Sequence, residues 1–326
     1  MAKDSIVLLS LDGGGSRGTL TAEVLRLLEQ HNRLDVRGSF DFFAGVSTGA
    51  LIASYCATNV GSMAYLAENL YSTQSLSRVF DKSVWDRILG RMQNQPKYDG
   101  VNKREFIQEL AGDLRLNDIT EKQLMVLAYD FINRDIVVFR NGSERYNPSL
   151  TEVCDAATAA PTLYPAVSTS EPRRRWLVDG ALATNDPSML AIAEAMSMGY
   201  RLEDIWMVSI GTGKPVHDLD QKQQDDIGHA ARGWGVVGWI ANGLLDHMLL
   251  GSSSISGYQC EQILGERYVR INGYLPRRLL QLDNTDDDHL GDLRSHAFEW
   301  YDEAGHQVID LLERVGRKRL VEDPAT

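Results

Sequence analysis

The stretch IVLLSLDGGGSRGTL (Ile6–Leu20) joins an apolar run of six residues to a glycine-rich loop and then to a segment with helical spacing. A nearly continuous apolar run is typical of a strand that is covered on both faces. Beyond the loop, apolar residues from Leu20 to Leu28 recur at the spacing of one helix face. The stretch therefore predicts a buried strand that passes through a glycine loop directly into a helix.

The glycine loop matches G-x-G-x-x-G through Gly13, Gly15 and Gly18, a pattern shared by several anion-binding sites. A dinucleotide site needs an acidic residue at the end of the second strand. The predicted second strand, Phe40–Ala44, carries its only acid, Asp41, near the start. A P-loop needs lysine after the last glycine, where this chain has threonine. A simple turn needs fewer glycines. The loop is better suited to hold a developing oxyanion with its backbone N–H groups.

A serine follows the second predicted strand within the sequence GVSTG, residues Gly45–Gly49. Between a strand and a helix, here predicted over Ala50–Ala57, G-x-S-x-G is typical of a nucleophile elbow that lifts the hydroxyl above the sheet. The flanking Gly45 and Gly49 let strand and helix pass closely, and the helix N-terminus favours an alkoxide. Ser47 is the candidate nucleophile, although only one strand precedes it, unlike the order of an α/β-hydrolase.

An aspartate is the candidate base for this serine. Asp179 ends the apolar run Trp176–Val178 and precedes Gly180, which puts a carboxylate at the C-terminal end of a strand, where open α/β sheets place their sites. Its alternative role is that of an aspartate in a tight turn. Burial beside Ser47 would raise its pKa and make it a better base. None of the seven histidines follows a strand in a glycine loop, and His289 is the best triad candidate by chain order.

Strand and helix patterns alternate along the remaining chain, which predicts a mostly parallel sheet with helices on both faces. The pattern predicts strands over Leu124–Tyr129, Ile136–Phe139 and Trp206–Ile210, and helices over Leu66–Phe80, Asn102–Leu114 with Asn102 as N-cap, Ser188–Met198 and His289–Arg314. We expect one domain over residues 1–326, with a helical excursion near 61–115 and a looser region near 213–260.

Composition and charge limit the partners, the metal or disulfide sites and the cellular location that we expect. The chain has 326 residues, a formal net charge of -12 and 43% hydrophobic residues. The negative charge argues against a nucleic-acid polymer as partner and against docking onto anionic lipid by charge. The three cysteines lack the spacing of a zinc site or a disulfide framework. The first apolar run, about six residues long, is shorter than the apolar core that a signal peptide needs, and no run approaches the roughly 18 apolar residues of a membrane span. We expect a cytoplasmic protein whose membrane contact is peripheral.

One late segment, WGVVGWIANGLLDHMLL (Trp234–Leu250), has two tryptophans, many aliphatic residues and few charges. It fits a helix that dips into lipid or a lid over the site. It equally fits a helix of the core. The sequence leaves these three alternatives open.

Together these features resemble the patatin-like phospholipase family. The family's glycine loop, G-G-G-x-R-G, is matched by residues 13–18, its G-x-S-x-G by residues 45–49 and its D-G-G/A by residues 179–181. Further similarities to the family lie at Ala156–Pro165, Asn185–Pro187 and Ser209–Gly213, and Asp246–Gln259 resembles a segment of its bacterial and plant members. The resemblance covers residues 5–315 approximately, which we take as the core of the domain.

The resemblance implies a three-layer α/β/α fold and a lipid acyl hydrolase. Such an enzyme uses a Ser47–Asp179 dyad, passes through an acyl-serine and needs no metal or cofactor. The backbone of Gly14 and Gly15 is expected to hold the oxyanion, Gly13 and Gly18 to shape the turn, and Arg17 to position the loop unless it is a solvated surface arginine.

The resemblance also bears on partners. The implied substrate is a phospholipid or lysophospholipid, approached from the inner face of the membrane. Some bacterial members are anti-phage effectors switched on by cyclic nucleotides, which makes such an activator a further expectation. The alternative is a weakly active or inactive module that binds a nucleotide or a partner protein. The sequence leaves the oligomeric state and the headgroup preference open.

Overall fold

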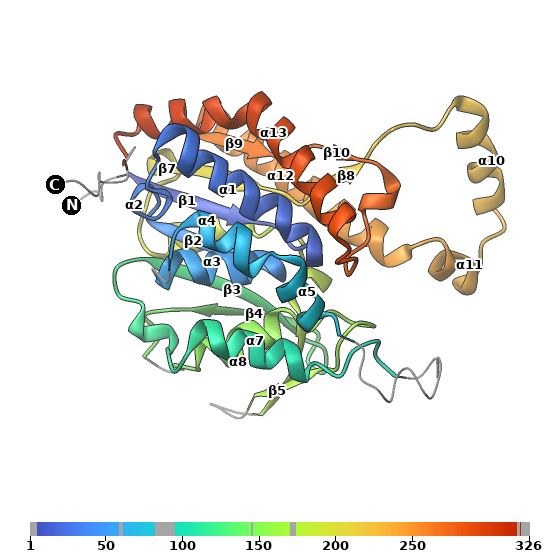
Figure 1. The fold of residues 1–326 in the computed structure, drawn as a ribbon, viewed down its shortest axis with the longest axis horizontal. Helices are drawn as coiled ribbons and strands as arrows, with labels where there is room; N and C mark the ends of the chain where they lie inside the picture. Colours follow the sequence, from blue (N-terminus) through green and yellow to red (C-terminus); the bar gives the residue numbers. More distant parts are fainter. Residues whose placement is uncertain are drawn as a thin grey trace.

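The computed structural model describes residues 5–58, 61–81, 95–144, 146–169, 174–317 and 320, and its centre is an eight-stranded sheet (Figure 1). The strands of this sheet are β1 (Ile6–Leu11), β2 (Phe42–Val46), β3 (Gln123–Asp130), β4 (Asp135–Arg140), β5 (Val167–Thr169), β6 (Arg175–Asp179), β7 (Ile205–Ile210) and β9 (Tyr268–Ile271). A separate two-stranded sheet pairs β8 (Lys214–Pro215) with β10 (Tyr274–Leu275).

The sheet is mostly parallel, as the alternating pattern predicts. β3, β2, β1, β7 and β9 pair side by side in this order and all run in one direction. β4 and β6 pair with β3 in the opposite direction, and β5 pairs antiparallel with β6. The carboxyl ends of the five parallel strands consequently meet at one edge of the sheet.

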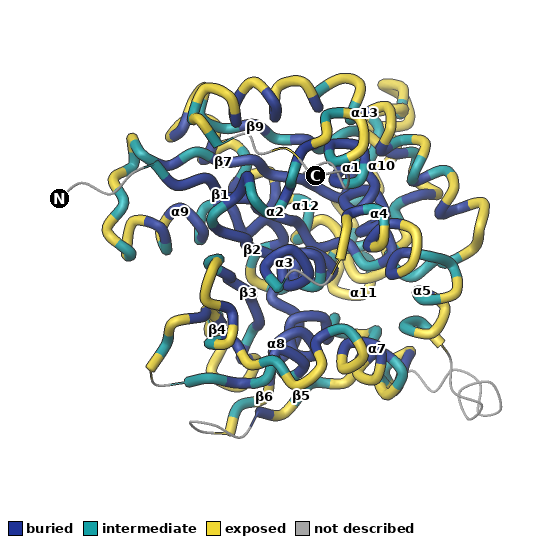
Figure 2. Tube along the Cα trace, turned by 60° about the vertical axis from the view of Figure 1, so that its left-hand side comes forward, coloured by how far each residue is buried: buried dark blue, intermediate teal, exposed yellow. Residues whose placement is uncertain are grey.

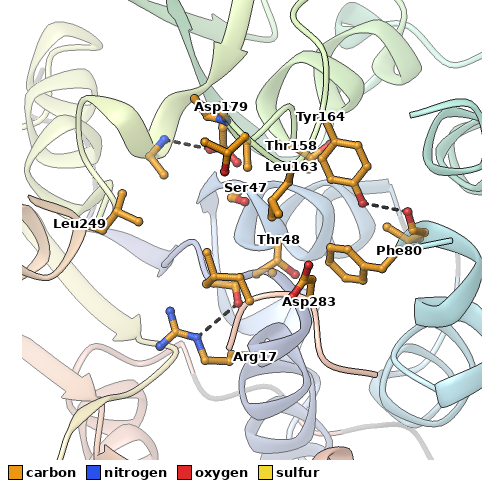
Figure 3. A pocket seen from close by; sticks show the side chains of 18 of the residues that line it. Arg17, Ser47, Thr48, Phe80, Thr158, Leu163, Tyr164, Asp179, Leu249 and Asp283 are labelled. Atoms are coloured by element: carbon orange, nitrogen blue, oxygen red, sulfur yellow. Dashed lines mark hydrogen bonds between the residues drawn. The ribbon is translucent and has the colours of Figure 1, made fainter. Parts of the chain in front are cut away.

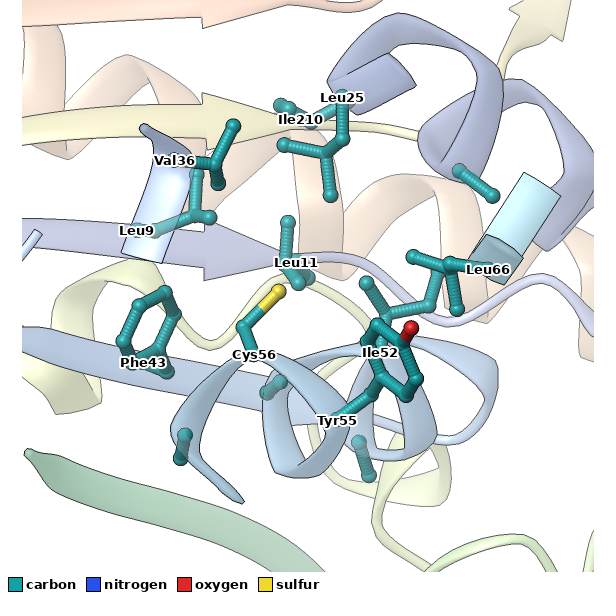
Figure 4. Close-up of a cluster of buried hydrophobic side chains, with 14 of the residues drawn as sticks. Leu9, Leu11, Leu25, Val36, Phe43, Ile52, Tyr55, Cys56, Leu66 and Ile210 are labelled. Atoms are coloured by element: carbon teal, nitrogen blue, oxygen red, sulfur yellow. The ribbon is translucent and has the colours of Figure 1, made fainter. Parts of the chain in front are cut away.

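Helices cover both faces of the sheet and complete three layers (Figure 2). On one face lie α1 (Gly18–Asn32), α3 (Thr48–Thr58), α8 (Leu150–Ala157) and α13 (Asp287–Arg314), and on the other α9 (Ser188–Ser197) and α12 (Leu244–Leu264). Because side chains alternate along a strand, β1 sends Leu9 and Leu11 to the first face and Leu8 to the second. Figure 4 shows Leu9 and Leu11 in the first of these cores, together with Phe43. The continuous apolar run of β1 is thus the signature of a strand buried on both sides.

Two helix predictions in the excursion near 61–115 were wrong in detail. The predicted helix over Leu66–Phe80 is divided into α4 (Met63–Tyr65), a π-helical turn (Leu66–Leu70) and α5 (Thr73–Val79). The division follows from Ser72, whose hydroxyl accepts from the N–H of Ser75 and caps a new helix. The second predicted helix is α7 (Val101–Ala111), and its N-cap is Gly100 rather than Asn102.

The region near 213–260 was predicted to be loose but is largely helical. It contains α10 (Gln221–Ala231), α11 (Val236–Ala241) and the long α12, which the pattern missed because its central part is rich in serine and glycine. α10 and α11 lie apart from the sheet (Figure 1). No residue of α11 is buried, so the alternative of a core helix over Trp234–Leu250 does not hold for this part.

Short elements connect the rest. They are α2 (Val36–Ser39) and the 3-10 turns Gly15–Arg17, Leu116–Asp118, Gly180–Leu182, Leu202–Asp204, Gly265–Arg267 and Arg277–Leu279. Among the described helices, none combines the length and the apolar character that crossing a bilayer requires.

Candidate active site

The glycine loop leaves β1 and leads into α1 along the carboxyl edge of the sheet. Gly15 has a φ of +59°, and a Cβ at this position would clash with the carbonyl of Leu282, so glycine alone fits. The N–H of Gly13 donates to the Asn185 carbonyl at 3.0 Å. Within the described residues, the N–H groups of Gly14 and Gly15 donate to no acceptor. Both residues line a large cavity that also reaches Ser47 and Asp179, and we call it the main cavity. The loop thus presents two free donors to this cavity.

Arg17 is buried and fixes the position of the glycine loop through its guanidinium group. Its guanidinium donates at 3.4 Å to the carbonyls of Gly14 and Gly213, which ties the glycine loop to the loop after β7. Burial lowers the pKa of Arg17 to about 10, still far above neutral, so the side chain keeps its charge. The alternative of a solvated surface arginine is excluded, because only 7% of the residue is exposed.

Ser47 occupies the turn between β2 and α3 in a strained conformation. Its φ is +54°, a region that residues with a side chain rarely adopt. The flanking glycines permit this sharp turn: a Cβ on Gly45 would clash with the carbonyl of Gly49, and one on Gly49 with the carbonyl of Leu11. The serine therefore lies at the N-terminus of α3, where the helix dipole favours negative charge on its oxygen.

The strand register brings Asp179 to Ser47. β4 pairs with β3 from Met125 to Asp130, whereas β2 pairs with β3 up to Leu127 and β6 from Ala128 onward. A strand has only two edges, so β2 and β6 share the edge that β4 leaves free. They approach along it from opposite directions, and Asp179, paired with Ala128, ends β6 where β2 ends.

This register corrects the reason for expecting a carboxylate here. The rule that sites lie at the C-terminal ends of strands applies to the parallel strands, and β6 runs against them. Asp179 nevertheless lies at the site because β6 overlaps β3 over only three residues, Leu177–Asp179. A longer overlap would carry the end of β6 further down β3, away from the site edge.

The Asp179 carboxylate is almost fully enclosed, with 1% of the residue exposed. Its Oδ1 accepts from the N–H of Ala181 at 2.9 Å, and its own N–H donates to the Ala159 carbonyl. Burial raises the pKa of Asp179 to about 6, opposed by the nearby Ser47 hydroxyl, the Ala181 N–H and the charge of Lys103. Among the described residues, Oδ2 has no partner with hydrogen-bond geometry. This oxygen is therefore free to accept a proton from the adjacent Ser47 (Figure 3).

Lys103 is a charged residue of the site that the sequence did not single out. It projects from α7, is 3% exposed and donates to the Asp155 carboxylate at 2.8 Å, the Asp155 carbonyl at 2.7 Å and Thr158 Oγ1 at 3.0 Å. These acceptors end α8, just before the carbonyl of Ala159 that holds Asp179. Nothing in the sequence KREF distinguishes this lysine from a solvated one.

Arg270 is a second charge that the sequence analysis missed. From β9 its guanidinium binds Asp12 Oδ2 at 2.6 Å and Asp186 Oδ2 at 3.1 Å. Asp12 precedes the glycine loop and Asp186 follows Asn185, so one partly buried cation joins the two segments that flank the site. Burial raises the pKa of Asp12 to about 7 against the pull of Arg270. The sequence does contain a signal for Arg270, because this arginine interrupts the short and otherwise apolar run YVRI.

The two site residues open into one cavity of about 680 Å³ (Figure 3). Gly14, Gly15, Ser47 and Asp179 lie on its wall, and most of the remaining lining is aliphatic or aromatic. An apolar cavity with a few convergent polar groups is the usual form of a site for an apolar ligand. His289, the triad candidate, is absent from the described lining.

Within the described residues, no cluster of three histidine, cysteine, aspartate or glutamate side chains has the arrangement of a metal site.

Comparison with known proteins decides the family. The model of the patatin-like phospholipases matches residues 9–192, which include the glycine loop, the serine elbow and Asp179. The chain belongs to the patatin-like phospholipase family. Patatin-like protein 2 of Oryza sativa is 29% identical, and the match covers 82% of this chain and 76% of the rice protein. Patatin-T5 of Solanum tuberosum is 26% identical, over 97% and 84% of the two chains.

The solved structures confirm the fold of this patatin-like protein. VipD from Legionella pneumophila superposes with a TM-score of 0.52 at 13% identity, and the match covers 96% of this chain and 67% of VipD. At this identity the likeness concerns the fold alone, and it confirms the predicted α/β architecture around a mostly parallel sheet.

Proposed function

We propose that this chain is a lipid acyl hydrolase of the phospholipase A or lysophospholipase type, with Ser47 and Asp179 as its dyad. The observation that carries the proposal is their meeting at the wall of an apolar cavity, beside two unengaged backbone N–H groups. Membership of the phospholipase family supports the same chemistry. The lining suits an acyl chain, and the polar end of the cavity suits the ester.

The mechanism that we propose has two halves. Ser47 Oγ attacks the ester carbonyl carbon while Asp179 accepts its proton, and the N–H groups of Gly14 and Gly15 stabilise the tetrahedral oxyanion. As the intermediate collapses, the carbon–oxygen bond to the leaving lysolipid breaks, and Asp179 returns the proton to that oxygen. Water then attacks the acyl-Ser47 ester with Asp179 as base, which releases the fatty acid and restores the serine.

Asp179 can act as base without a histidine because of its burial. An ordinary aspartate has a pKa near 4 and holds a proton too weakly to be an efficient base at neutral pH. The raised pKa, about 6, brings the carboxylate close to the working range. The charge of Lys103 and the Ala181 N–H keep it ionised at pH 7.

A fluorophosphonate probe tests the proposed chemistry on the wild-type chain. We expect the probe to label Ser47, and we expect fatty acid release from phosphatidylcholine in mixed micelles. An inactive module that binds a nucleotide or partner protein would show neither reaction. The predicted cyclic-nucleotide activator, which the resemblance to bacterial anti-phage effectors suggests, is tested by repeating both assays with a panel of cyclic dinucleotides and oligonucleotides. Absence of reaction throughout the panel contradicts the hydrolase proposal.

The activity should follow the ionisation of Asp179. Only the ionised carboxylate accepts a proton, so kcat/KM should rise through pH 6 and level off above it. Below pH 5 it should fall about tenfold per pH unit. The measurement is a pH profile with an uncharged ester. Lys103→Met serves as the control, because removing the positive charge should move the midpoint upward. A midpoint at pH 4 in the wild-type protein would contradict the assignment.

We further propose that the α11 region brings this protein peripherally to the inner face of a membrane. Val236 and Val237 of α11 are 78% and 81% exposed, and Met248 of α12 is 53% exposed. Ile240 is also well exposed, and both it and Met248 line the cavity. An apolar surface that continues into the cavity offers a lipid a path out of the bilayer without crossing water.

Val236→Ser combined with Val237→Ser should weaken binding to phosphatidylcholine vesicles by about tenfold or more, because two aliphatic contacts with lipid are lost. Vesicle co-sedimentation measures the effect. Thermal stability should stay unchanged because both side chains are exposed. Met196→Ser, which removes an exposed apolar residue from α9, is the matched control and should leave vesicle binding intact. Equal binding by the valine variant and the wild type would refute the membrane contact.

A further inference from the structure

A second, small cavity of about 20 Å³ adjoins the main cavity. Three side chains line both cavities: Leu51 from α3, and Ile107 and Leu110 from α7. Because each of these three side chains contacts both cavities, together they form the partition between the main cavity and the small one. We call them the leucine wall.

The helices around the wall show which way it faces. Along α3, the residues run from Ser47 at the N-terminus through Leu51 to Tyr55 and Thr58, of which the last two line only the small cavity. At 1.5 Å per residue, Leu51 lies about 6 Å along the helix from Ser47. The two cavities and the wall therefore succeed one another along α3, starting at the nucleophile.

Two further helices repeat this order. On α7, Lys103 and Phe106 line the main cavity, and Ala111 lines only the small one. At α8 the chain runs the other way: Thr158, just beyond the helix, lines the main cavity, whereas Cys154 lines the small one. α3 and α7 thus give the same order from the dyad to the wall and then to the small cavity, and α8 gives the same order of the two cavities.

The wall is thin and apolar. Leu51 and Leu110 are only partly buried although they belong to the interior, because part of their surface faces the cavities. The polar groups behind the wall are already engaged: Thr58 Oγ1 donates to the Ser54 carbonyl at 2.8 Å, and Ser54 Oγ contacts Cys154 Sγ at 3.4 Å. An apolar chain that entered the small cavity would leave none of these groups without a partner.

We infer that the leucine wall ends the acyl-binding part of the site and sets the longest acyl chain that the enzyme accepts efficiently. The inference rests on the proposed hydrolase function. An acyl group on Ser47 Oγ would extend along α3 and α7 until its last methyl group meets Leu51, Ile107 and Leu110. Longer chains would have to bend or leave carbons in water.

Leu110→Ala should open the wall, because it removes three carbon atoms and joins the two cavities. Each additional buried methylene group changes a transfer equilibrium by about fourfold. For an ester two carbons longer than the wild-type optimum, kcat/KM relative to that optimum should therefore rise about tenfold. Leu110→Phe should do the reverse and move the optimum to shorter chains.

The experiment measures kcat/KM for p-nitrophenyl esters from butyrate to stearate in detergent micelles of fixed composition. Leu150→Ala is the matched control, because Leu150 lines only the small cavity and loses the same atoms without opening the wall. Thermal unfolding of each variant shows that it is folded.

The expected result is a longer optimum for Leu110→Ala, a shorter one for Leu110→Phe and an unchanged one for Leu150→Ala. An unchanged optimum in both folded Leu110 variants overturns the inference, and so does a shift in Leu150→Ala. If Leu110→Ala does not fold, Leu110→Phe decides alone. Failure of the proposed function is distinguishable, since the wild-type chain would then hydrolyse no ester.

Discussion

Ser47→Ala should lower kcat for ester hydrolysis by about 10⁴-fold or more, because the proposed acyl intermediate forms on the hydroxyl that this substitution removes. Labelling by the fluorophosphonate probe should disappear as well. The fold should persist, since alanine removes only the hydroxyl, whose neighbour is the Asp179 carboxylate at the cavity wall, and adds no atom that could crowd the site. The measurements are fatty acid release, intact-protein mass after labelling and thermal unfolding.

Two variants sharpen this result. Ser47→Gly should be equally inactive but more stable by about 1 kcal/mol, because glycine adopts a φ of +54° without strain. Ser197→Ala, at the exposed end of α9, should keep full activity and labelling. Labelling that persists in Ser47→Ala would show that the reactive serine lies elsewhere and would remove the basis of the proposed mechanism.

Asp179→Asn should reduce kcat by about 10³-fold, because the amide cannot accept the serine proton. Its side chain keeps the shape of the carboxylate, and its oxygen can still accept from the Ala181 N–H. Labelling should slow in proportion, while KM should change little. A folded Asp179→Asn variant with wild-type kcat would exclude this residue as the base.

The same substitution should stabilise the protein above pH 6. The folded-state pKa of Asp179, about 6, exceeds the ordinary aspartate pKa of 3.8, so the folded protein loses stability as pH rises through this window. A shift of this size corresponds to about 3 kcal/mol when the carboxyl group is fully ionised. Asparagine avoids this cost, so the variant should unfold at a higher temperature than the wild type at pH 8. Below pH 4 this advantage should vanish. A higher unfolding temperature of the variant at pH 8 would show that the protein holds the carboxylate of Asp179 at the expense of stability.

Much of the fold and part of the site followed from local sequence. The apolar run of β1 is a strand because it must be covered on both faces, and the glycines after it permit a turn that no side chain allows. The elbow at Ser47 follows from glycines at positions 45 and 49, which let β2, α3 and β1 approach. These predictions succeeded because each depends on residues only a few positions apart.

The bounds of several helices followed less well from the sequence, because the apolar pattern alone does not set them. Met63–Val79 is broken by a serine cap within a pattern that reads as one helix. α12 is a long helix although its serines and glycines weaken any apolar periodicity. It holds the loop that contains Asn185, because Ser253 Oγ accepts a hydrogen bond from the Asn185 side-chain amide at 3.1 Å. The break at Ser72 has a local cause, a cap that the apolar pattern does not record, whereas α12 is stabilised by tertiary contacts that propensity does not encode.

The sequence by itself determined the glycine loop, the strained serine and the presence of a carboxylate at position 179. Only the tertiary structure decided that this carboxylate meets the serine, because the meeting depends on which edge of β3 receives β6 and on an overlap of three residues. It also decided that Lys103 is a buried charge, that Arg270 is a partly buried one and that no residue of 236–241 is buried. Strand pairing and burial bring together residues that lie far apart in the chain. A local pattern of side chains does not show which of these distant residues will meet.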